Sequence, residues 1–206
     1  MSRCVIICAG EHGPINFTFM PDDFLICCDA GLSIARQMGL RPDLIIGDFD
    51  SLEQPLPDDI PVMHFPVEKD DTDSMLAVRE GLRRGFDDFA LLFSLGGRLD
   101  HTFSNLQTLD FILTSGAIGQ LVGPQDEVHM IRNGTAEFPF REGYALSVFC
   151  WDGPAEGVTL RGVQYPLDGT RIQSSFPIGA CNHIVAPQAS VMVEHGTLLV
   201  ICSRIQ

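Results

Sequence analysis

Three acidic clusters in the first half of the chain combine side chains that bind metal ions and phosphate groups. In chain order they are Gly47-Asp48-Phe49-Asp50-Ser51, Lys69-Asp70-Asp71-Thr72-Asp73 and Gly96-Gly97-Arg98-Leu99-Asp100-His101. Each follows a short apolar run, so we expect each at the end of a strand. Carboxylates gathered in one place repel one another unless a positive group lies between them. Mg²⁺ holding a phosphorylated substrate is the simplest such group, because it prefers oxygen ligands.

The first cluster has two aspartates, Asp48 and Asp50, two positions apart. In extended backbone such side chains point the same way, so both carboxylates would face one ion while Phe49 points back into the core. An Asp-rich turn after a strand is the alternative, and this cluster alone does not separate the two.

The second cluster contains Lys69, the only lysine of the chain. A lysine ammonium acts as a point charge for a phosphate group. Thr72 and Asp73 suit the N-cap of a helix, which is the alternative interpretation. Capping does not require Asp70 and Asp71 as well, so these carboxylates are available to a metal ion.

The third cluster is a Gly-Gly loop that exposes backbone N–H groups to an anion. Arg98 offers a fork for phosphate, and Asp100 lies next to a predicted helix start. A tight turn with a capping aspartate is the alternative. The three clusters carry more weight together, because open α/β sheets bind ligands outside the carboxyl ends of their strands. Neither a P-loop nor a Rossmann fingerprint is present in the sequence.

The elements that must position these clusters are predicted from hydrophobic periodicity. Short apolar runs indicate strands buried on both faces, at 4–9, 24–28, 44–46, 62–65 and 89–93. Apolar residues at helical spacing predict helices over 74–84 and 102–114. Strands that alternate with helices indicate an α/β domain with a mostly parallel sheet.

The second half of the chain changes character from about residue 119. It contains short β-type runs separated by turn signals, at 128–131, 145–150, 157–160, 183–186, 190–194 and 197–201. We expect a smaller C-terminal β-sandwich, with a tight hairpin at His195-Gly196. The predicted domains are an α/β catalytic domain over residues 1–120 and a sandwich over 121–206.

Composition excludes several classes of partner. The 206 residues include 13 Lys and Arg against 27 Asp and Glu, a formal net charge of −14. This charge argues against nucleic acid and against an anionic membrane surface. No segment has the roughly 20 apolar residues that span a bilayer, and we expect a cytoplasmic protein. Seven cysteines without C-x-x-C spacing indicate reduced thiols rather than disulfides or a zinc site.

The clusters, taken with Cys28-Asp29-Ala30-Gly31, resemble the ordered motif set of the thiamine pyrophosphokinases. The likeness continues in the second half of the chain. Gly162-Val163-Gln164-Tyr165-Pro166-Leu167 resembles the G-x-x-Y-P-L segment of that family, and Gly179-Ala180-Cys181-Asn182 resembles its G-x-S-N segment. The resemblance covers nearly the whole chain, in order, and is specific as a set.

The resemblance implies an enzyme that transfers the diphosphoryl group of ATP to the hydroxyl of thiamine, giving thiamine diphosphate and AMP. It also implies a homodimer, with thiamine bound between the α/β domain of one subunit and the sandwich of the other. Mg²⁺ is the expected cofactor, with metal ligands Asp48, Asp50 and Asp73. The expected ATP and phosphate contacts are Asp29, Lys69, Asp70, Thr72, Arg98, His101 and Asn105.

The expected catalytic residues are Asp71, Asp73, Asp100 and Arg98. Asp71 and Asp100 are the candidates to orient or deprotonate the thiamine hydroxyl. The expected thiamine contacts are Ser174, Ser175, Cys181 and Asn182. Cys181 stands where the family has serine, so a thiol replaces that hydroxyl or the serines at 174 and 175 supply it. Ala30 and Ser33 also depart from the family's D-G-G-x-N form.

Two other functions compete with this one. The first is a Mg²⁺-dependent diphosphokinase for another heterocyclic alcohol, such as a hydroxymethyl-pterin. The second is a non-catalytic sensor of nucleotide or thiamine. Tyr165-Pro166-Leu167 and Asn182 favour thiamine, and the full set of acidic residues argues against a sensor.

Overall fold

The computed structural model describes residues 2–49, 55–66, 68 and 70–205. Within the chain, contacts cluster into two compact units, Met1–Pro124 and Gln125–Gln206. No helix of the described residues is long and apolar enough to cross a membrane.

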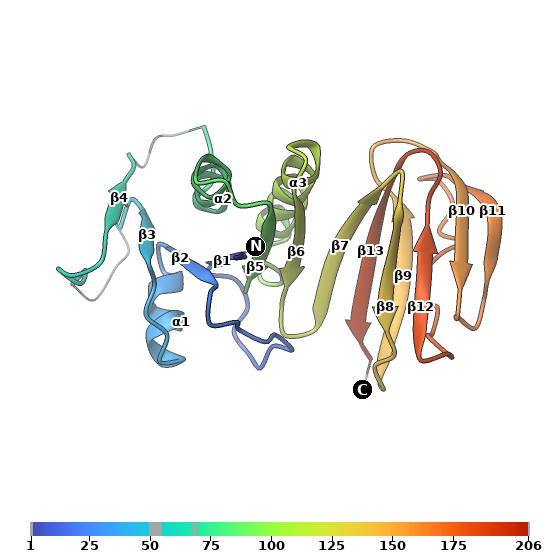
Figure 1. The fold of residues 1–206 in the computed structure, drawn as a ribbon, viewed down its shortest axis with the longest axis horizontal. Coiled ribbons are helices and arrows are strands. Elements are labelled where there is room, and N and C mark those ends of the chain that lie inside the picture. Colours follow the sequence, from blue (N-terminus) through green and yellow to red (C-terminus); the bar gives the residue numbers. More distant parts are fainter. Residues whose placement is uncertain (1, 50–54, 67, 69, 206) are drawn as a thin grey trace. The chain divides into compact units, whose positions relative to one another are not determined.

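The first unit contains a parallel sheet (Figure 1). Its strands are β1 (Cys4–Ile7), β2 (Phe24–Cys28), β3 (Leu44–Gly47), β4 (Val62–His64), β5 (Asp88–Leu92) and β6 (Ile118–Val122). They run in the order β4-β3-β2-β1-β5-β6, and every neighbouring pair is parallel. The chain moves outward from β1 to β4 and then returns beside β1 as β5. This reversal is the topological switch point at which open α/β sheets bind ligands.

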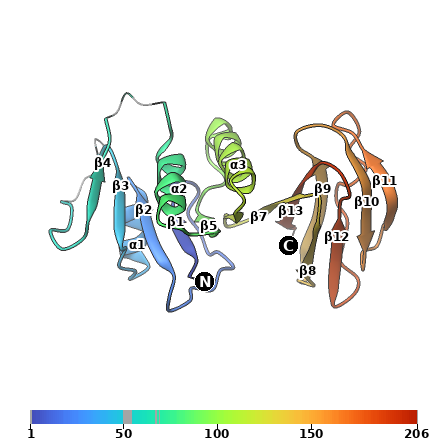
Figure 2. The same ribbon diagram turned by 45° about the horizontal axis from the view of Figure 1, so that its top comes forward.

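Helices cover both faces of this sheet (Figure 2). They are α1 (Gly31–Gln37), α2 (Asp73–Arg83) and α3 (Leu99–Thr114). Leu32 and Ile34 of α1 share a core cluster with Val5 of β1. On the opposite face, a Cβ added to Gly81 of α2 would lie 2.5 Å from the Phe89 ring of β5, so glycine permits this close packing.

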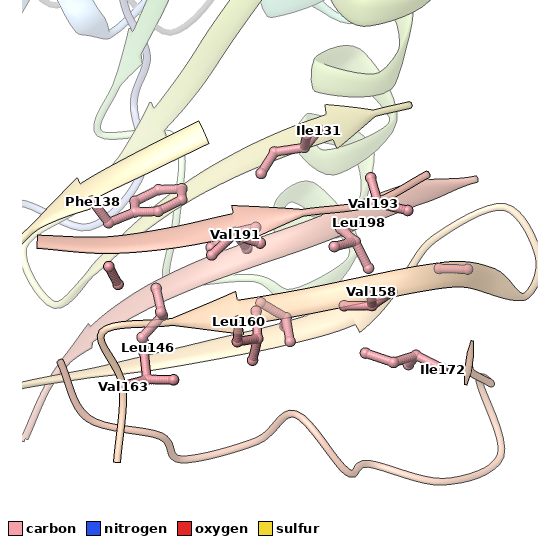
Figure 3. Close-up of a cluster of buried hydrophobic side chains, with 14 of the residues drawn as sticks. Ile131, Phe138, Leu146, Val158, Leu160, Val163, Ile172, Val191, Val193 and Leu198 are labelled. Atoms are coloured by element: carbon pink, nitrogen blue, oxygen red, sulfur yellow. The ribbon is translucent and has the colours of Figure 1, made fainter. Parts of the chain in front are cut away.

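The second unit is built from antiparallel strands. They are β7 (Asp126–Arg132), β8 (Thr135–Pro139), β9 (Tyr144–Cys150), β10 (Ala155–Arg161), β11 (Leu167–Ile172), β12 (Gln188–Met192) and β13 (Thr197–Arg204). β13 pairs with β7 and β9, while the second layer has the order β11-β10-β12-β8. Side chains from both layers form one core, in which Leu198 and Leu146 face Leu160 and Val191 (Figure 3).

The predicted fold class is confirmed: a mainly parallel α/β unit is followed by an antiparallel β-sandwich. The predicted hairpin at His195-Gly196 is wrong. β12 and β13 belong to different layers, and the chain crosses between layers here while His195 forms a bridge with Glu156. The predicted strand at 183–186 is reduced to one bridge between Ile184 and Val163.

Candidate active site

The loops that follow β2 and β3 lie against each other at the carboxyl edge of the sheet. The Asp29 N–H donates to the Ile46 carbonyl at 2.8 Å. A Cβ added to Gly47 would lie 3.2 Å from the Cα and Cβ atoms of Asp29, which is tighter than ordinary contact. Asp29 has a φ of +40°, a left-handed angle that is costly for a residue with a side chain. The two loops therefore bring Asp29 and Asp48 to one place.

Phe49, between the two aspartates of the first acidic cluster, points inward from a left-handed backbone angle. Its ring packs on the core of the sheet and meets the His64 ring at a centroid distance of 4.6 Å, so the expected inward direction is confirmed. Its φ is +60°, so the extended backbone expected between Asp48 and Asp50 is wrong at this position. Asp50 lies outside the described residues.

The second cluster begins α2 beside the end of β2. Thr72 is the N-cap, and its hydroxyl accepts the Met75 N–H at 3.3 Å. The Cys28 thiol donates to the Asp73 carbonyl at 3.4 Å, which places Asp73 at the same sheet edge as Asp29. Asp70 is exposed. Lys69 lies outside the described residues.

Asp71 is engaged by an arginine that the sequence interpretation did not include. Its Oδ2 atom lies 2.9 Å from Nε of Arg79, which belongs to α2. The Arg79 guanidinium also lies over the Phe111 ring of α3, 4.7 Å from its centroid. The carboxylate of Asp71 therefore already has an arginine partner within the protein.

The third cluster holds an exposed, two-pronged ion pair. Arg98 donates to Asp100 through Nη2 at 2.5 Å and through Nε at 3.1 Å. The hydrogen bond from Arg98 lowers the pKa of Asp100, and Asp100 in turn raises the pKa of Arg98. The His101 N–H donates to Asp100 as well, at 3.0 Å. Asp100 therefore engages two of the five N–H donors of the Arg98 guanidinium.

An open cavity of about 650 Å³ adjoins this ion pair. Its lining residues are all in or next to the first turns of α3: Arg98, Leu99, Asp100, Phe103, Ser104 and Gln107. Leu99 is 81% exposed. The cavity joins an apolar wall to a charged pair, which suits an aromatic ligand with a polar end.

Glu11 was not included among the predicted acidic residues of the site. It lies in the loop after β1, beside the third cluster. Its N–H donates to the Leu95 carbonyl at 3.2 Å, and the Gly10 N–H donates to the Phe93 carbonyl at 2.7 Å. Its carboxylate packs so closely on Gly96 that a Cβ there would clash. Its position could have been predicted, because Glu11 follows the first apolar run just as the acidic clusters follow later apolar runs.

Asn105 does not project toward solvent as a free ligand-binding amide. It is 9% exposed, and its amide bonds to Ser74 and to Ser94. His101, by contrast, is exposed near the start of α3.

In the second unit, the residues expected to contact thiamine differ in exposure. Ser174, Ser175 and Cys181 are exposed. Cys181 has a φ of +56°, and its N–H donates to the Ser147 hydroxyl at 3.0 Å. Asn182 is 4% exposed and bonds to the backbone of Tyr165.

The donor chemistry of the sheet edge fits Mg²⁺. Asp48 and Asp73 supply carboxylate oxygens, the ligands this ion prefers. Across the described residues, no group of three or more His, Cys, Asp or Glu side chains is arranged to hold a metal ion. Mg²⁺ is commonly bound by one or two carboxylates together with substrate phosphates and water, so a complete protein cage is not required.

Two family models match the chain in succession. The model described as "Thiamin pyrophosphokinase, catalytic domain" matches residues 18–116. The model described as "Thiamin pyrophosphokinase, vitamin B1 binding domain" matches residues 129–198. The thiamine pyrophosphokinase of Bacillus subtilis (strain 168) is 25% identical over 181 residues, which is 85% of each chain.

Solved structures show the same fold. The chain matches the crystal structure of thiamine pyrophosphokinase from Bacillus subtilis with a TM-score of 0.90, at 23% identity over 98% of this chain and 99% of that one. It matches the thiamin pyrophosphokinase of Geobacillus thermodenitrificans with a TM-score of 0.81, at 25% identity over 98% and 97% of the two chains. Because both units match the two domains of one family in turn, the chain belongs to the thiamine pyrophosphokinase family.

Proposed function

We propose that this protein transfers the diphosphoryl group of Mg²⁺-bound ATP to the hydroxyl of thiamine, forming thiamine diphosphate and AMP. The observation that carries the proposal is the succession of a catalytic-domain match and a vitamin B1 binding-domain match on one chain. The gathering of Asp29, Asp48 and Asp73 at one sheet edge supports it, because phosphoryl transfer depends on positioned charge.

In this proposal Asp48, Asp50 and Asp73 hold Mg²⁺, which offsets negative charge on the phosphate oxygens when bound. Lys69 and Arg98 are the cationic partners of the same oxygens. The expected remaining nucleotide contacts are Asp29, Asp70, Thr72 and His101. Asn105 is not among them, because its amide already bonds to Ser74 and Ser94.

Asp100, which lines the cavity at the start of α3, is the proposed acceptor of the thiamine proton. When Arg98 turns to a phosphate group, Asp100 loses its ion pair and its pKa rises toward the usual range. The hydroxyl proton then passes to Asp100 as the new bond forms between the thiamine oxygen and the β-phosphorus. The bond from the β-phosphorus to the oxygen of the α-phosphate breaks, and AMP leaves. Asp71 has Arg79 as its partner and is not given the role of proton acceptor in this proposal.

The thiamine side of the proposal rests on the second unit. The exposed Ser174, Ser175 and Cys181 are the proposed side-chain contacts, and Asn182 shapes the neighbouring Tyr165 segment. The active unit is proposed to be a homodimer in which each thiamine contacts both subunits.

The test is an assay of the purified chain with ATP, Mg²⁺ and one acceptor at a time. Thiamine should give equimolar AMP and thiamine diphosphate, and chelation of Mg²⁺ should abolish both products. A hydroxymethyl-pterin and a reaction without acceptor are the matched controls. Turnover with the pterin and none with thiamine would identify the pterin as the substrate. Binding of thiamine or ATP without turnover would establish a sensor instead.

A further inference from the structure

A buried hydrogen-bond chain joins the start of α2 to the segment before α3. Asn105 of α3 accepts a hydrogen bond through Oδ1 from the Ser74 hydroxyl at 2.8 Å. Its Nδ2 donates to the Ser94 carbonyl at 2.7 Å. All three residues are buried, with exposed fractions of 9% for Asn105, 8% for Ser74 and 3% for Ser94. One amide therefore ties together two segments that are separate in the sequence.

Both ends of this chain are anchored next to an acidic cluster. At one end, the Ser74 hydroxyl lies 3.1 Å from the hydroxyl of Thr72, the N-cap that follows Asp70 and Asp71. At the other end, the Ser94 hydroxyl donates to the Leu91 carbonyl of β5 at 2.8 Å, just before the Gly-Gly loop. The second and third clusters are thus connected through the interior rather than through solvent.

An asparagine suits this position because its side chain offers a donor and an acceptor. An aspartate would still accept from Ser74 but would place a negative oxygen against the Ser94 carbonyl. An apolar residue would leave both buried partners without a hydrogen bond, which is costly. A fully satisfied buried network of this kind holds one defined geometry.

We propose that Asn105 is a positioning residue that fixes the spacing between the second and third acidic clusters, rather than a ligand of ATP. Both ends of its amide already have partners inside the protein, and burial of the residue to 9% exposure leaves little of it open to a nucleotide. The catalytic part of this inference rests on the proposed function. Phosphoryl transfer needs close alignment, and a misplacement of about 1 Å costs on the order of a hundredfold in rate.

The test uses three variants of the full chain: Asn105→Ala, Ser74→Ala and the double variant. Thr108→Val is the matched control. Thr108 is fully buried in the same helix, but its hydroxyl donates only within that helix, to the Ser104 carbonyl at 3.0 Å. The control therefore removes a buried hydroxyl without cutting the connection between α2 and the loop.

The first measurement compares turnover with binding of a non-cleavable α,β-methylene analogue of ATP. Asn105→Ala and Ser74→Ala should each lower kcat by about thirtyfold or more. The double variant should be no slower than the slower single variant, because both cut one connection. The dissociation constant of the analogue should change by less than about threefold, as in Thr108→Val. A tenfold weaker analogue affinity in Asn105→Ala, with wild-type behaviour of Ser74→Ala, would make Asn105 a nucleotide ligand and overturn the proposal.

The second measurement does not depend on activity. Amide hydrogen exchange should accelerate over residues 70–75 and 95–100 in Asn105→Ala and in Ser74→Ala, and should not do so in Thr108→Val. Unchanged exchange in both segments would overturn the positioning role. This result holds whether or not the wild-type chain proves to be a diphosphokinase, so failure of the proposed function and failure of this inference are distinguishable.

Discussion

The side-chain amide of Asn182 clamps the backbone of Tyr165 from both sides. Its Oδ1 accepts the Tyr165 N–H at 3.0 Å, and its Nδ2 donates to the Tyr165 carbonyl at 2.7 Å. The same Oδ1 also accepts the His183 N–H at 2.9 Å. Asn182 is 4% exposed, whereas Tyr165 is 61% exposed. A buried asparagine thus holds an exposed aromatic segment in place.

Asn182→Ala should therefore destabilise the protein as well as weaken thiamine binding. Losing the clamp removes hydrogen bonds from part-buried backbone groups, at a cost of about 1–3 kcal/mol in the free energy of unfolding. Denaturant unfolding measures this change, with the exposed Ser175→Ala as the control. Unchanged stability together with a higher KM for thiamine would instead mean that Asn182 acts only as a substrate contact.

Asp48→Asn should lower kcat by about a hundredfold or more, because it removes one charged ligand from the proposed metal site. The loss should be smaller at high Mg²⁺ if the ion still binds weakly. Asp58→Asn is the control, since Asp58 is an exposed aspartate outside the clusters. Equal turnover in the two variants at limiting Mg²⁺ would contradict a metal role for Asp48.

The pair of Arg98 and Asp100 predicts a pH effect. A base must be ionised to accept a proton, so activity falls as the pH drops through its pKa. Arg98 lowers the pKa of Asp100. Arg98→Ala should therefore move the acid limb of kcat/KM for ATP, which reports the protein before nucleotide binds, to higher pH, in addition to reducing the rate. An acid limb that stays in place would show that another group accepts the proton.

Much of the fold could be predicted because buried parallel strands leave continuous apolar runs, such as Phe24–Cys28 of β2. β8 and β11 left no such run, because they are edge strands whose side chains are largely exposed. The short helix α1 also went unpredicted. Its start depends on Gly31, where an added Cβ would clash with the Ile7 carbonyl, and this contact is invisible without the sheet.

The acidic clusters were visible in the sequence because parallel strands end at a common edge. The side chains that pair with these residues inside the protein could not be predicted from the sequence. The contact of Arg79 with Asp71 and that of Ser74 with Asn105 both depend on how α2 is oriented and packed against α3. Residue type alone therefore suggested ligand contacts for Asn105 and Asn182, whereas the structure gives their amides protein partners.

Cys181 predicts a selective chemical test. Its thiol is exposed, whereas Cys4, Cys8, Cys27 and Cys28 are buried. A mild alkylating reagent should modify Cys181 first, inactivate the enzyme, and be slowed by bound thiamine. Cys181→Ser should resist the reagent and lower the KM for thiamine up to about tenfold, the worth of one ordinary hydrogen bond. No protection by thiamine and an unchanged KM would place Cys181 outside the binding site.

In the proposed reaction a diphosphoryl group moves as one unit from ATP to thiamine. The most direct measurement uses ATP labelled at the γ-phosphorus and, separately, at the α-phosphorus, with the products separated after one turnover. The γ label should appear in thiamine diphosphate, and the α label should remain entirely in AMP. Formation of ADP with the γ label in thiamine monophosphate would contradict the account, because the attacked atom would then be the γ-phosphorus.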